Sequence, residues 1–240
     1  MSASALPEFV QLVGHPLRWQ LVSALARSDL RVRELVVLAG EPQNLVSYHL
    51  RLLRDGGLVT SRRSSFDGRD SYYHLDLDRC AAALVDVGVA LHPALRMAPV
   101  PSLKRRRGQP SVLFVCSGNS ARSPIAEALL RRHAGDQVRV RSAGTVPKDR
   151  IHPHAVRVLR EHYDIDIAGQ APRSVDSTVH DRVITLCDKA REVLSAPVHW
   201  SIPDPVAVGN GRYAAFVEAA ADIDTRVRHL APTLVSEKEE

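Results

Sequence analysis

The 240-residue sequence has only three cysteines and no apolar run long enough to cross a membrane. So few cysteines, and an odd number of them, do not build a disulfide framework and suit a reducing compartment. No stretch approaches the roughly 20 apolar residues of a membrane helix. Residues 1–19 lack the charged start and long apolar core of a secretory signal. These absences predict a cytoplasmic protein that does not associate with a membrane.

Internal repeats and low-complexity tracts are also missing, and the length suits two domains. The net charge of +5 is unevenly spread: residues 1–98 hold 11 Lys and Arg against 10 Asp and Glu, and residues 111–240 hold 17 of each. Residues 99–110 hold four basic residues, Lys104–Arg107, and no acid. Prolines and a glycine flank them, which predicts a basic linker that is either simply solvated or in contact with a phosphate backbone. The predicted division is a first domain, a linker, a second domain and a charged tail, at residues 1–98, 99–110, 111–235 and 236–240.

The N-terminal half combines helical apolar spacing with two short strand-like runs. The third predicted helix is expected to turn four residues inward: Leu45, Val46, Leu50 and Leu53. A polar turn around Asp67 and Gly68 separates the two strand-like runs. This order of elements is typical of an α+β winged helix-turn-helix. The predicted elements are helices near residues 17–25, 32–38 and 42–54 and strands at 58–60 and 71–75.

The outward face of the third helix is polar, and short polar side chains on a protruding helix can reach base edges in the major groove. Arginines on the neighbouring hairpin can hold phosphates. A winged helix used only for protein contacts is the alternative. The expected contacts with double-stranded DNA are Gln43, Asn44, Ser47, Tyr48, His49 and Arg51 on the helix and Arg62, Arg63 and Arg69 on the hairpin.

Two stretches of this half resemble arsenic-repressor-type (ArsR) bacterial regulators. Residues 14–18 (GHPLR) resemble their opening helix turn, and residues 43–59 (QNLVSYHLRLLRDGGLV) resemble their recognition helix. The resemblance covers about residues 5–95 and implies a homodimer that reads a palindromic operator. The apolar segment Ala81–Leu91 and the first helix are expected to form the dimer interface.

The inducer site common in that family is where the sequence departs from it. Many members bind arsenite or a soft metal through paired cysteines in the helix before the recognition helix, and Arg31–Ala39 has none. Soft-metal capture needs thiolates close together. Cys80 stands alone and is expected to be a small buried residue at the dimer contact. Since His92 and the scattered histidines show no ligand spacing, no metal site is assigned.

In the C-terminal half, a buried-strand pattern at Ser111–Val115 runs directly into the loop Cys116–Pro124 (CSGNSARSP) and then into a helix. The N–H groups of such a loop converge on one point, where the helix dipole adds positive potential, and Gly118 is expected to permit the turn. Arg122 can clasp two oxygens of an oxyanion, and the same field favours a thiolate on Cys116. Cys116 is therefore predicted to be a nucleophile, with a buried structural cysteine as the alternative. The expected oxyanion-binding residues are Ser117, Gly118, Asn119, Ser120, Ala121, Arg122 and Ser123, the last of which can donate a hydrogen bond to the thiolate.

The other apolar runs of this half favour an α/β fold with a doubly wound, four-stranded parallel sheet. Further strands are predicted at residues 138–142, 181–187 and 197–200, and a closing helix at 213–230. Such sheets bind ligands at the carboxyl ends of their strands. Cys116, Cys187 and the loop with Asp204 all follow strand ends and can therefore converge.

This half resembles the low-molecular-weight tyrosine phosphatase fold, which includes one class of arsenate reductases, over about residues 111–232. As a phosphatase it would use Asp204 to protonate the leaving phenol and then to help water hydrolyse the cysteinyl-phosphate. As a reductase it would attack arsenate with Cys116, and Cys187 would release arsenite. Three features favour the reductase. Val206 and Ala207 stand where phosphatases place aromatic residues, Cys187 stands where reductases place their first resolving cysteine, and residues 119–123, 183–192 and 199–205 look more like the reductase branch. The predicted catalytic residues are Cys116, Arg122, Asp204 and Cys187.

Two positions depart from the reductase pattern. Leu194 occupies the place of a second resolving cysteine, and Pro124 stands where reductases more often have glutamine. The resemblance therefore implies no tightly bound cofactor but an external thiol reductant: mycothiol, glutathione or a thioredoxin system. The sequence as a whole predicts a DNA-binding regulator fused to a thiol-dependent arsenate reductase. A fused phosphatase and a catalytically silent oxyanion sensor are the alternatives.

Overall fold

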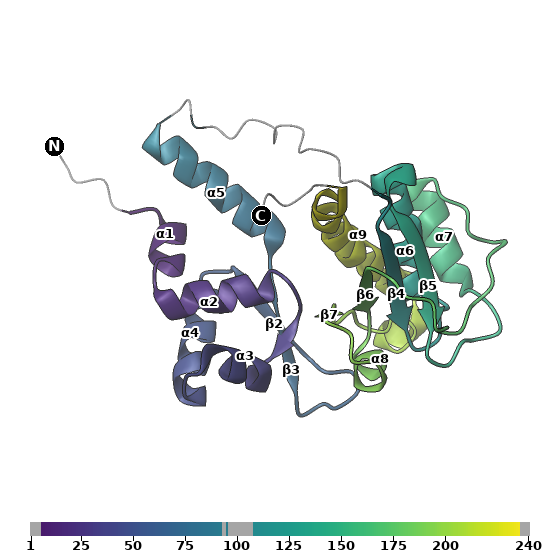
Figure 1. Ribbon diagram of the computed structural model, residues 1–240, viewed down its shortest axis with the longest axis horizontal. Coiled ribbons are helices and arrows are strands. Elements are labelled where there is room, and N and C mark those ends of the chain that lie inside the picture. The colour runs from purple at the N-terminus through teal and green to yellow at the C-terminus, as the bar shows by residue number, and fades with distance from the viewer. Residues whose placement is uncertain (1–5, 93–94, 96–107, 236–240) are drawn as a thin grey trace. The chain divides into compact units, whose positions relative to one another are not determined.

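The structure, a computed structural model, describes residues 6–92, 95 and 108–235 (Figure 1). The chain divides into two compact units, Met1–Ser102 and Leu103–Glu240. Most of the predicted basic linker, with Lys104–Arg107, and the predicted tail 236–240 lie outside the described residues. Among the described helices, none combines the length and the apolar character needed to cross a membrane.

The described part of the N-terminal unit is a set of helices with a three-stranded antiparallel sheet of order β1-β3-β2. Leu21, Leu35, Val46 and Leu53 are among the buried core residues. The predicted α+β winged helix-turn-helix is confirmed. Its elements are α1 (Glu8–Val13), α2 (Pro16–Leu25), β1 (Leu30–Arg31), α3 (Val32–Ala39), α4 (Gln43–Asp55), β2 (Val59–Arg63), β3 (Ser71–Leu75) and α5 (Leu77–Leu91).

Local chemistry explains where several of these helices begin and end. His15 Nδ1 accepts the N–H of Leu17 and so caps α2, whose first residue is Pro16. Gly40 ends α3 in the left-handed conformation, at φ 66°. The Asp76 carboxylate accepts the N–H of Arg79 at the start of α5. The hairpin is longer than predicted, because β2 continues to Arg63 in register with β3.

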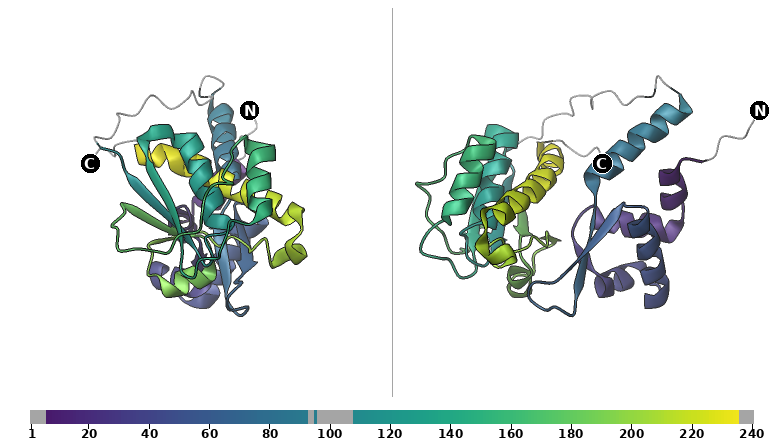
Figure 2. Two further views of the ribbon diagram at one scale, coloured as in Figure 1. Left: turned by 90° about the vertical axis from the view of Figure 1, so that its right-hand side faces the viewer. Right: turned by 180° about the vertical axis from the view of Figure 1, so that it is seen from behind.

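The C-terminal unit has a four-stranded parallel sheet in its described residues, of order β5-β4-β6-β7, which confirms the predicted fold class. Phe114, Ile125, Leu129 and Phe216 are fully buried in its core. In Figures 1 and 2, α6 (teal) and α9 (yellow) lie side by side. The elements are β4 (Ser111–Cys116), α6 (Arg122–Ala134), β5 (Arg139–Gly144), α7 (Pro153–Tyr163), β6 (Arg182–Thr185), α8 (Asp188–Val193), β7 (Val198–His199) and α9 (Tyr213–Val235), with 3₁₀ turns at Gly135–Gln137 and Val208–Gly211.

The strand order places the functional loop. After β4 the chain moves to one side of it as β5 and then crosses to the other side as β6. The carboxyl end of β4 is thus the point where the strand order reverses, and open parallel sheets bind ligands there. Cys116 is the last residue of β4 and pairs with Gly144 at the end of β5. The predicted nucleophile lies at this position.

Candidate active site and DNA-contact surface

The carbonyl groups of the loop after β4 hold it in place by accepting hydrogen bonds from the segment that follows β5. The carbonyls of Cys116, Ser117, Gly118 and Ser120 accept hydrogen bonds of 2.8–3.1 Å from the N–H groups of Thr145, Val146, Lys148 and His152, respectively. In a trans peptide the N–H points opposite to the C=O. The N–H groups of residues 117, 118, 119 and 121 are therefore turned toward the inside of the loop. In the described part of the chain none of them donates to a backbone carbonyl. This arrangement suits an anion.

A glycine on the neighbouring strand lets the loop approach so closely. A Cβ atom on Gly144 would lie 2.7 Å from Ser117 O and 2.9 Å from Asn119 N, which no side chain can tolerate. The expectation that Gly118 permits the turn is wrong. The residue in the left-handed conformation is Asn119, at φ 44°. Asparagine adopts this conformation more readily than most residues because its short side chain can form local hydrogen bonds.

Asn119 is buried and makes such bonds. Its Nδ2 donates to Ser123 Oγ and to Ser142 Oγ, each at 2.9 Å, and its Oδ1 accepts from Arg173 N at 2.7 Å. Ser123 in the first turn of α6, Ser142 on β5 and the backbone of Arg173 thus hold this left-handed residue of the loop. Such support is what maintains an uncommon backbone conformation at a functional site.

Cys116 is 2% exposed, and its Sγ lies 3.1 Å from Ser123 Oγ. The same hydroxyl lies 3.3 Å from Ala143 O, to which it can donate. When Cys116 is a thiol, its S–H can donate to Ser123 while Ser123 donates to Ala143. When Cys116 is a thiolate, the Ser123 hydroxyl can turn and donate to sulfur. Ser123 is thus suited to both protonation states of the sulfur.

Arg122 and Asp204 lie together at this loop. Arg122 is 6% exposed, and one of its guanidinium nitrogens lies 3.0 Å from Asp204 Oδ2 while another donates to Ile202 O at 3.1 Å. The other Asp204 oxygen accepts the N–H of Val206 at 3.0 Å, which fixes the carboxylate. A predicted anion clamp and a predicted proton donor are therefore in contact.

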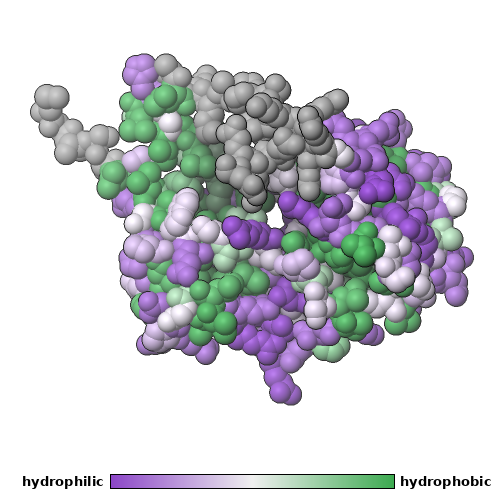
Figure 3. Space-filling view, in the orientation of Figure 1, coloured by the Kyte–Doolittle hydropathy of each residue, from purple (hydrophilic) through white to green (hydrophobic). Residues whose placement is uncertain are grey.

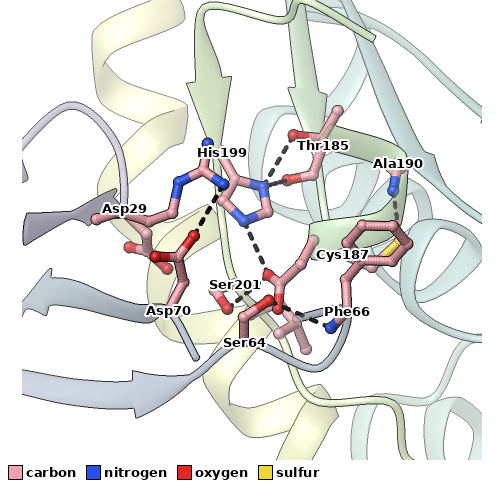
Figure 4. Close-up of polar contacts among 12 residues, drawn as sticks. Asp29, Ser64, Phe66, Asp70, Thr185, Cys187, Ala190, His199 and Ser201 are labelled. Atoms are coloured by element: carbon pink, nitrogen blue, oxygen red, sulfur yellow. Dashed lines mark hydrogen bonds and ion pairs between the residues drawn. The ribbon is translucent and has the colours of Figure 1, made fainter. Parts of the chain in front are cut away.

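Cys187 lies two residues after the end of β6 and contacts the loop. It is 2% exposed, and its Sγ lies 3.2 Å from the Oγ of Ser117, a loop residue. The Sγ also accepts the N–H of Ala190 at 3.4 Å in the first turn of α8 (Figure 4). The four predicted catalytic residues thus meet around one loop. Leu194 follows α8 and packs partly buried against the core.

Sequence reasoning missed a buried carboxylate that supports the loop. Glu127 on α6 is 1% exposed and forms ion pairs with Arg131 and Arg173. It accepts a hydrogen bond from Ser142, which in turn accepts from Asn119. The available signal was a glutamate inside the apolar face of the helix after the loop, because a charge there needs partners.

The DNA-contact residues predicted in the N-terminal unit are exposed or half-buried, with one exception. His49 is 5% exposed, so the expectation that it faces outward is wrong. Its ring lies 4.4 Å from the ring of His15, and burial, with nearby His15 and Arg18, lowers its pKa. Leu45, predicted to face inward, is 37% exposed instead. The exposed or half-buried predicted residues are Gln43, Asn44, Ser47, Tyr48, Arg51, Arg62, Arg63 and Arg69.

The predicted dimer segment Ala81–Leu91 lies within α5 and carries exposed apolar side chains, among them Leu84 and Leu91. Apolar surface gathers over this helix in Figure 3. Trp19 on α2, the predicted partner helix, is 58% exposed. Cys80 is buried, and burial and the nearby Asp76 raise its pKa to about 11. A thiol with such a pKa is a weak nucleophile near neutral pH.

The four-stranded parallel sheet and the loop after β4, where Cys116, Arg122 and Asp204 meet, define a class of enzyme that acts on a tetrahedral oxyanion. Residues 111–240 match the model of the low molecular weight phosphotyrosine protein phosphatase family, and the chain belongs to that family. Residues 15–61 match the bacterial regulatory protein, arsR family. The chain thus carries an arsR-family helix-turn-helix ahead of a phosphatase-family domain.

Curated relatives match the C-terminal half. Arsenate reductase 1 of Bacillus cereus is 32% identical over 132 residues, which are 51% of this chain and 95% of that protein. An arsenate reductase of Bacillus licheniformis is 33% identical over 135 residues, with coverage of 51% and 96%. Among solved structures, an arsenate reductase of Archaeoglobus fulgidus is 31% identical with a TM-score of 0.43, covering 50% of this chain and 98% of that one. A YwlE mutant of Bacillus subtilis is 24% identical with a TM-score of 0.47, covering 52% and 99%.

Proposed function

We propose that the protein is a DNA-binding transcriptional regulator fused to a thiol-dependent arsenate reductase. The observation that carries the proposal is the contact of a second buried thiol, Cys187, with the loop that begins at Cys116. A phosphatase has no use for such a thiol, whereas a reductase needs one. The arsenate reductase names of the relatives that match this half support the same choice.

In the first step the loop N–H groups and Arg122 hold arsenate, and the Cys116 thiolate attacks the arsenic. An As–O bond breaks, and Asp204 supplies the proton with which that oxygen leaves as water. In the second step the sulfur of Cys187 attacks the sulfur of Cys116. The S–As bond breaks, its electron pair stays on arsenic, and arsenite leaves as a disulfide forms. Two thiols have then lost two electrons and As(V) has gained them.

An external thiol must then reduce the Cys116–Cys187 disulfide, because Leu194 offers no third sulfur. Mycothiol, glutathione or a thioredoxin system can supply it. The N-terminal unit binds double-stranded DNA through α4 and the β2–β3 hairpin, as a homodimer that buries the exposed apolar side chains of α5 and α2.

The proposal is tested by measuring arsenite release from arsenate, with a thiol reductant present, for the wild type and for Cys187→Ser. The variant is expected to release no arsenite while it still hydrolyses p-nitrophenyl phosphate, because only reduction needs the second thiol. Cys116→Ser should lose both reactions. A wild type that turns over the phosphate ester well and arsenate not at all would refute the reductase function.

The phosphatase alternative would use the same Asp204 carboxylate, held 3.0 Å from Arg122, to protonate its leaving group, so this contact suits both reactions. The same two assays distinguish it. An oxyanion sensor would instead bind DNA with an arsenate-dependent affinity that Cys116→Ser retains. DNA binding itself is tested by measuring the affinity for the DNA that flanks the gene at increasing salt concentrations. No sequence preference and no salt dependence would refute the regulator function.

A further inference from the structure

A buried histidine that contacts residues on both sides of Cys187 in the sequence has no part in the steps above. His199, the last residue of β7, has no exposed surface, and Asp188, the first residue of α8, is 2% exposed. The ring Nε2 lies 3.1 Å from Asp188 Oδ1, which also accepts a hydrogen bond of 2.8 Å from Ser201 Oγ. On the other side of the ring, Nδ1 lies 2.9 Å from Thr185 Oγ1 and 3.2 Å from Thr185 O (Figure 4). His199 thus bridges Thr185, two residues before Cys187, and Asp188, the residue after it.

Groups on both sides of the buried ring can hold it in place. At Nδ1, the Thr185 hydroxyl can donate or accept a hydrogen bond, whereas the Thr185 carbonyl can only accept one. At the other side, Asp188 Oδ1 is shared between Nε2 and the Ser201 hydroxyl. The carboxyl group that directly follows Cys187 is therefore buried together with hydrogen-bond partners, as a buried polar group requires.

The bridge fixes the turn that presents the second thiol. Cys187 lies in the connection between β6 and α8, and its Sγ meets Ser117 of the oxyanion loop. The neighbouring Leu186 N–H is bonded to Val115 O at 2.7 Å, which ties this connection to β4. Without the imidazole, Thr185 and Asp188 would lose their common partner, and the turn could rotate Sγ away from Ser117. A displacement of about 1 Å is enough to slow a reaction between two positioned groups substantially.

We propose that His199 is a positioning residue that, through Thr185 and Asp188, holds the Cys187 thiol toward the oxyanion loop for the second step of reduction. The proposal rests on the proposed function. In this step the S–S bond forms, the S–As bond breaks with its electrons left on arsenic, and the Cys187 proton passes to an oxygen of the released arsenite. The first step uses Cys116, Arg122 and Asp204 and does not depend on His199.

The test is a single turnover of the full-length protein with arsenate in the absence of reductant. The rate is measured as the loss of two thiols per protein chain. Hydrolysis of p-nitrophenyl phosphate reports the Cys116 chemistry separately. His199→Gln is expected to slow thiol loss by about tenfold or more, as loss of a buried hydrogen bond to a charged group would, and to leave ester hydrolysis within about twofold of wild type. The matched control is His133→Gln, which removes a His–Asp contact of 2.8 Å between α6 and α9 and should change neither rate.

A second variant keeps the test decisive if His199→Gln does not fold. Ser201→Ala removes one donor to Asp188 and should slow thiol loss by a smaller factor. Thiol loss at the wild-type rate in a folded His199→Gln or Ser201→Ala protein overturns the positioning role, as does parallel loss of both reactions. A wild type that loses no thiols with arsenate refutes the proposed function instead.

Discussion

The two units bury polar side chains in different ways. In the C-terminal unit, buried polar residues form two connected sets. Ser123, Asn119, Ser142 and Glu127 lead by hydrogen bonds to the Cys116 thiol. Ser201, Asp188 and His199 form the other set, in which Asp188 directly follows Cys187 in the chain. In the N-terminal unit the residues expected to contact DNA are exposed or half-buried, apart from His49. Buried His49 contacts the ring of another histidine rather than a polar network.

The difference follows from what each surface has to do. A reaction on an oxyanion needs donors already in place, because preorganised dipoles in a water-poor site stabilise developing charge most strongly. Contacts with a phosphate backbone gain from counterion release and work with long side chains that stay hydrated until they bind. The chemistry therefore depends on buried support, whereas DNA affinity depends on exposed charge.

The largest effect that separates the two units is expected from Arg122→Lys. Lysine keeps the charge but cannot bind two oxygens in a bidentate fashion. Its single nitrogen also cannot replace the two guanidinium nitrogens that contact Asp204 and Ile202 O. Both arsenate reduction and ester hydrolysis should fall about a hundredfold or more, as after loss of an oxyanion donor. DNA affinity should not change. Steady-state kinetics and a DNA-binding titration measure the two effects, with the exposed Arg132→Lys as the control. Near-normal kinetics in Arg122→Lys would contradict the clamp.

Glu127→Gln tests whether buried support matters apart from the reacting groups. The neutral amide no longer compensates Arg131 and Arg173, and Ser142 loses a charged acceptor. We expect the free energy of unfolding to fall by about 2 kcal/mol and both activities to fall about tenfold. Urea unfolding can be followed through the buried Trp200 in a Trp19→Phe background. Glu218→Gln, at an exposed position of α9, is the control, and equal effects of the two variants would rule out the supporting role.

The parts of this molecule that the sequence predicted are those with a local pattern. Helical spacing identified α4, and an unbroken apolar run followed by CSGNSARSP identified β4 and the loop. Elements that depend on distant partners were missed. The two-residue β1 exists because Leu30 and Arg31 pair with Tyr73 and Tyr72, and no local periodicity marks it. The short helix α8 was likewise not predicted. The helix α7 was also missed, although Ala155, Val158 and Leu159 give it a local apolar pattern.

Two errors at the sites have a shared cause, which is that residue type was given more weight than position. His49 was predicted to face outward because histidine is polar, although Val46, His49, Leu50 and Leu53 fall on one face at helical spacing. Gly118 was predicted to permit the turn because glycine is conformationally permissive, although Asn119 is the loop residue in the left-handed conformation. In both cases a partner from another segment decides the outcome: the His15 ring for His49, and Ser142 and Arg173 for Asn119.

A smaller and purely electrostatic effect is expected on the hairpin. The side chain of Arg69 is 95% exposed, so Arg69→Ala should leave stability unchanged. If Arg69 neutralises one phosphate, DNA affinity should fall about equally on all sequences, and the slope of log K against log salt should become less steep by about 0.9. Arg27→Ala, an exposed arginine outside α4 and the hairpin, is the control. An unchanged slope in Arg69→Ala would show that Arg69 does not contact a phosphate. Altered enzyme kinetics would contradict the assignment of DNA binding and catalysis to separate units.

The smallest effect is a pH dependence that belongs to the N-terminal unit. Burial, with His15 and Arg18 nearby, holds the pKa of His49 below its ordinary 6.5, while Glu41 opposes the shift. The unfolded chain therefore binds a proton more readily than the folded one, and stability rises with pH in this window. As pH falls below about 6.5, the unit should lose stability, and the loss should level off beneath the lowered pKa. Hydrogen exchange of α4 amides, corrected for intrinsic rates, measures this.

His49→Leu should flatten that pH dependence, because leucine suits the buried face that Val46, Leu50 and Leu53 share with position 49. The exposed His162→Leu on α7, in the other unit, is the control and should leave it unchanged. If α4 loosens at low pH equally in wild type and His49→Leu, another group is responsible. We also expect DNA binding to weaken as pH falls from about 7.5 to about 5.5, because α4 is less stable there. Hydrolysis of p-nitrophenyl phosphate should show a different pH profile, since it does not depend on His49.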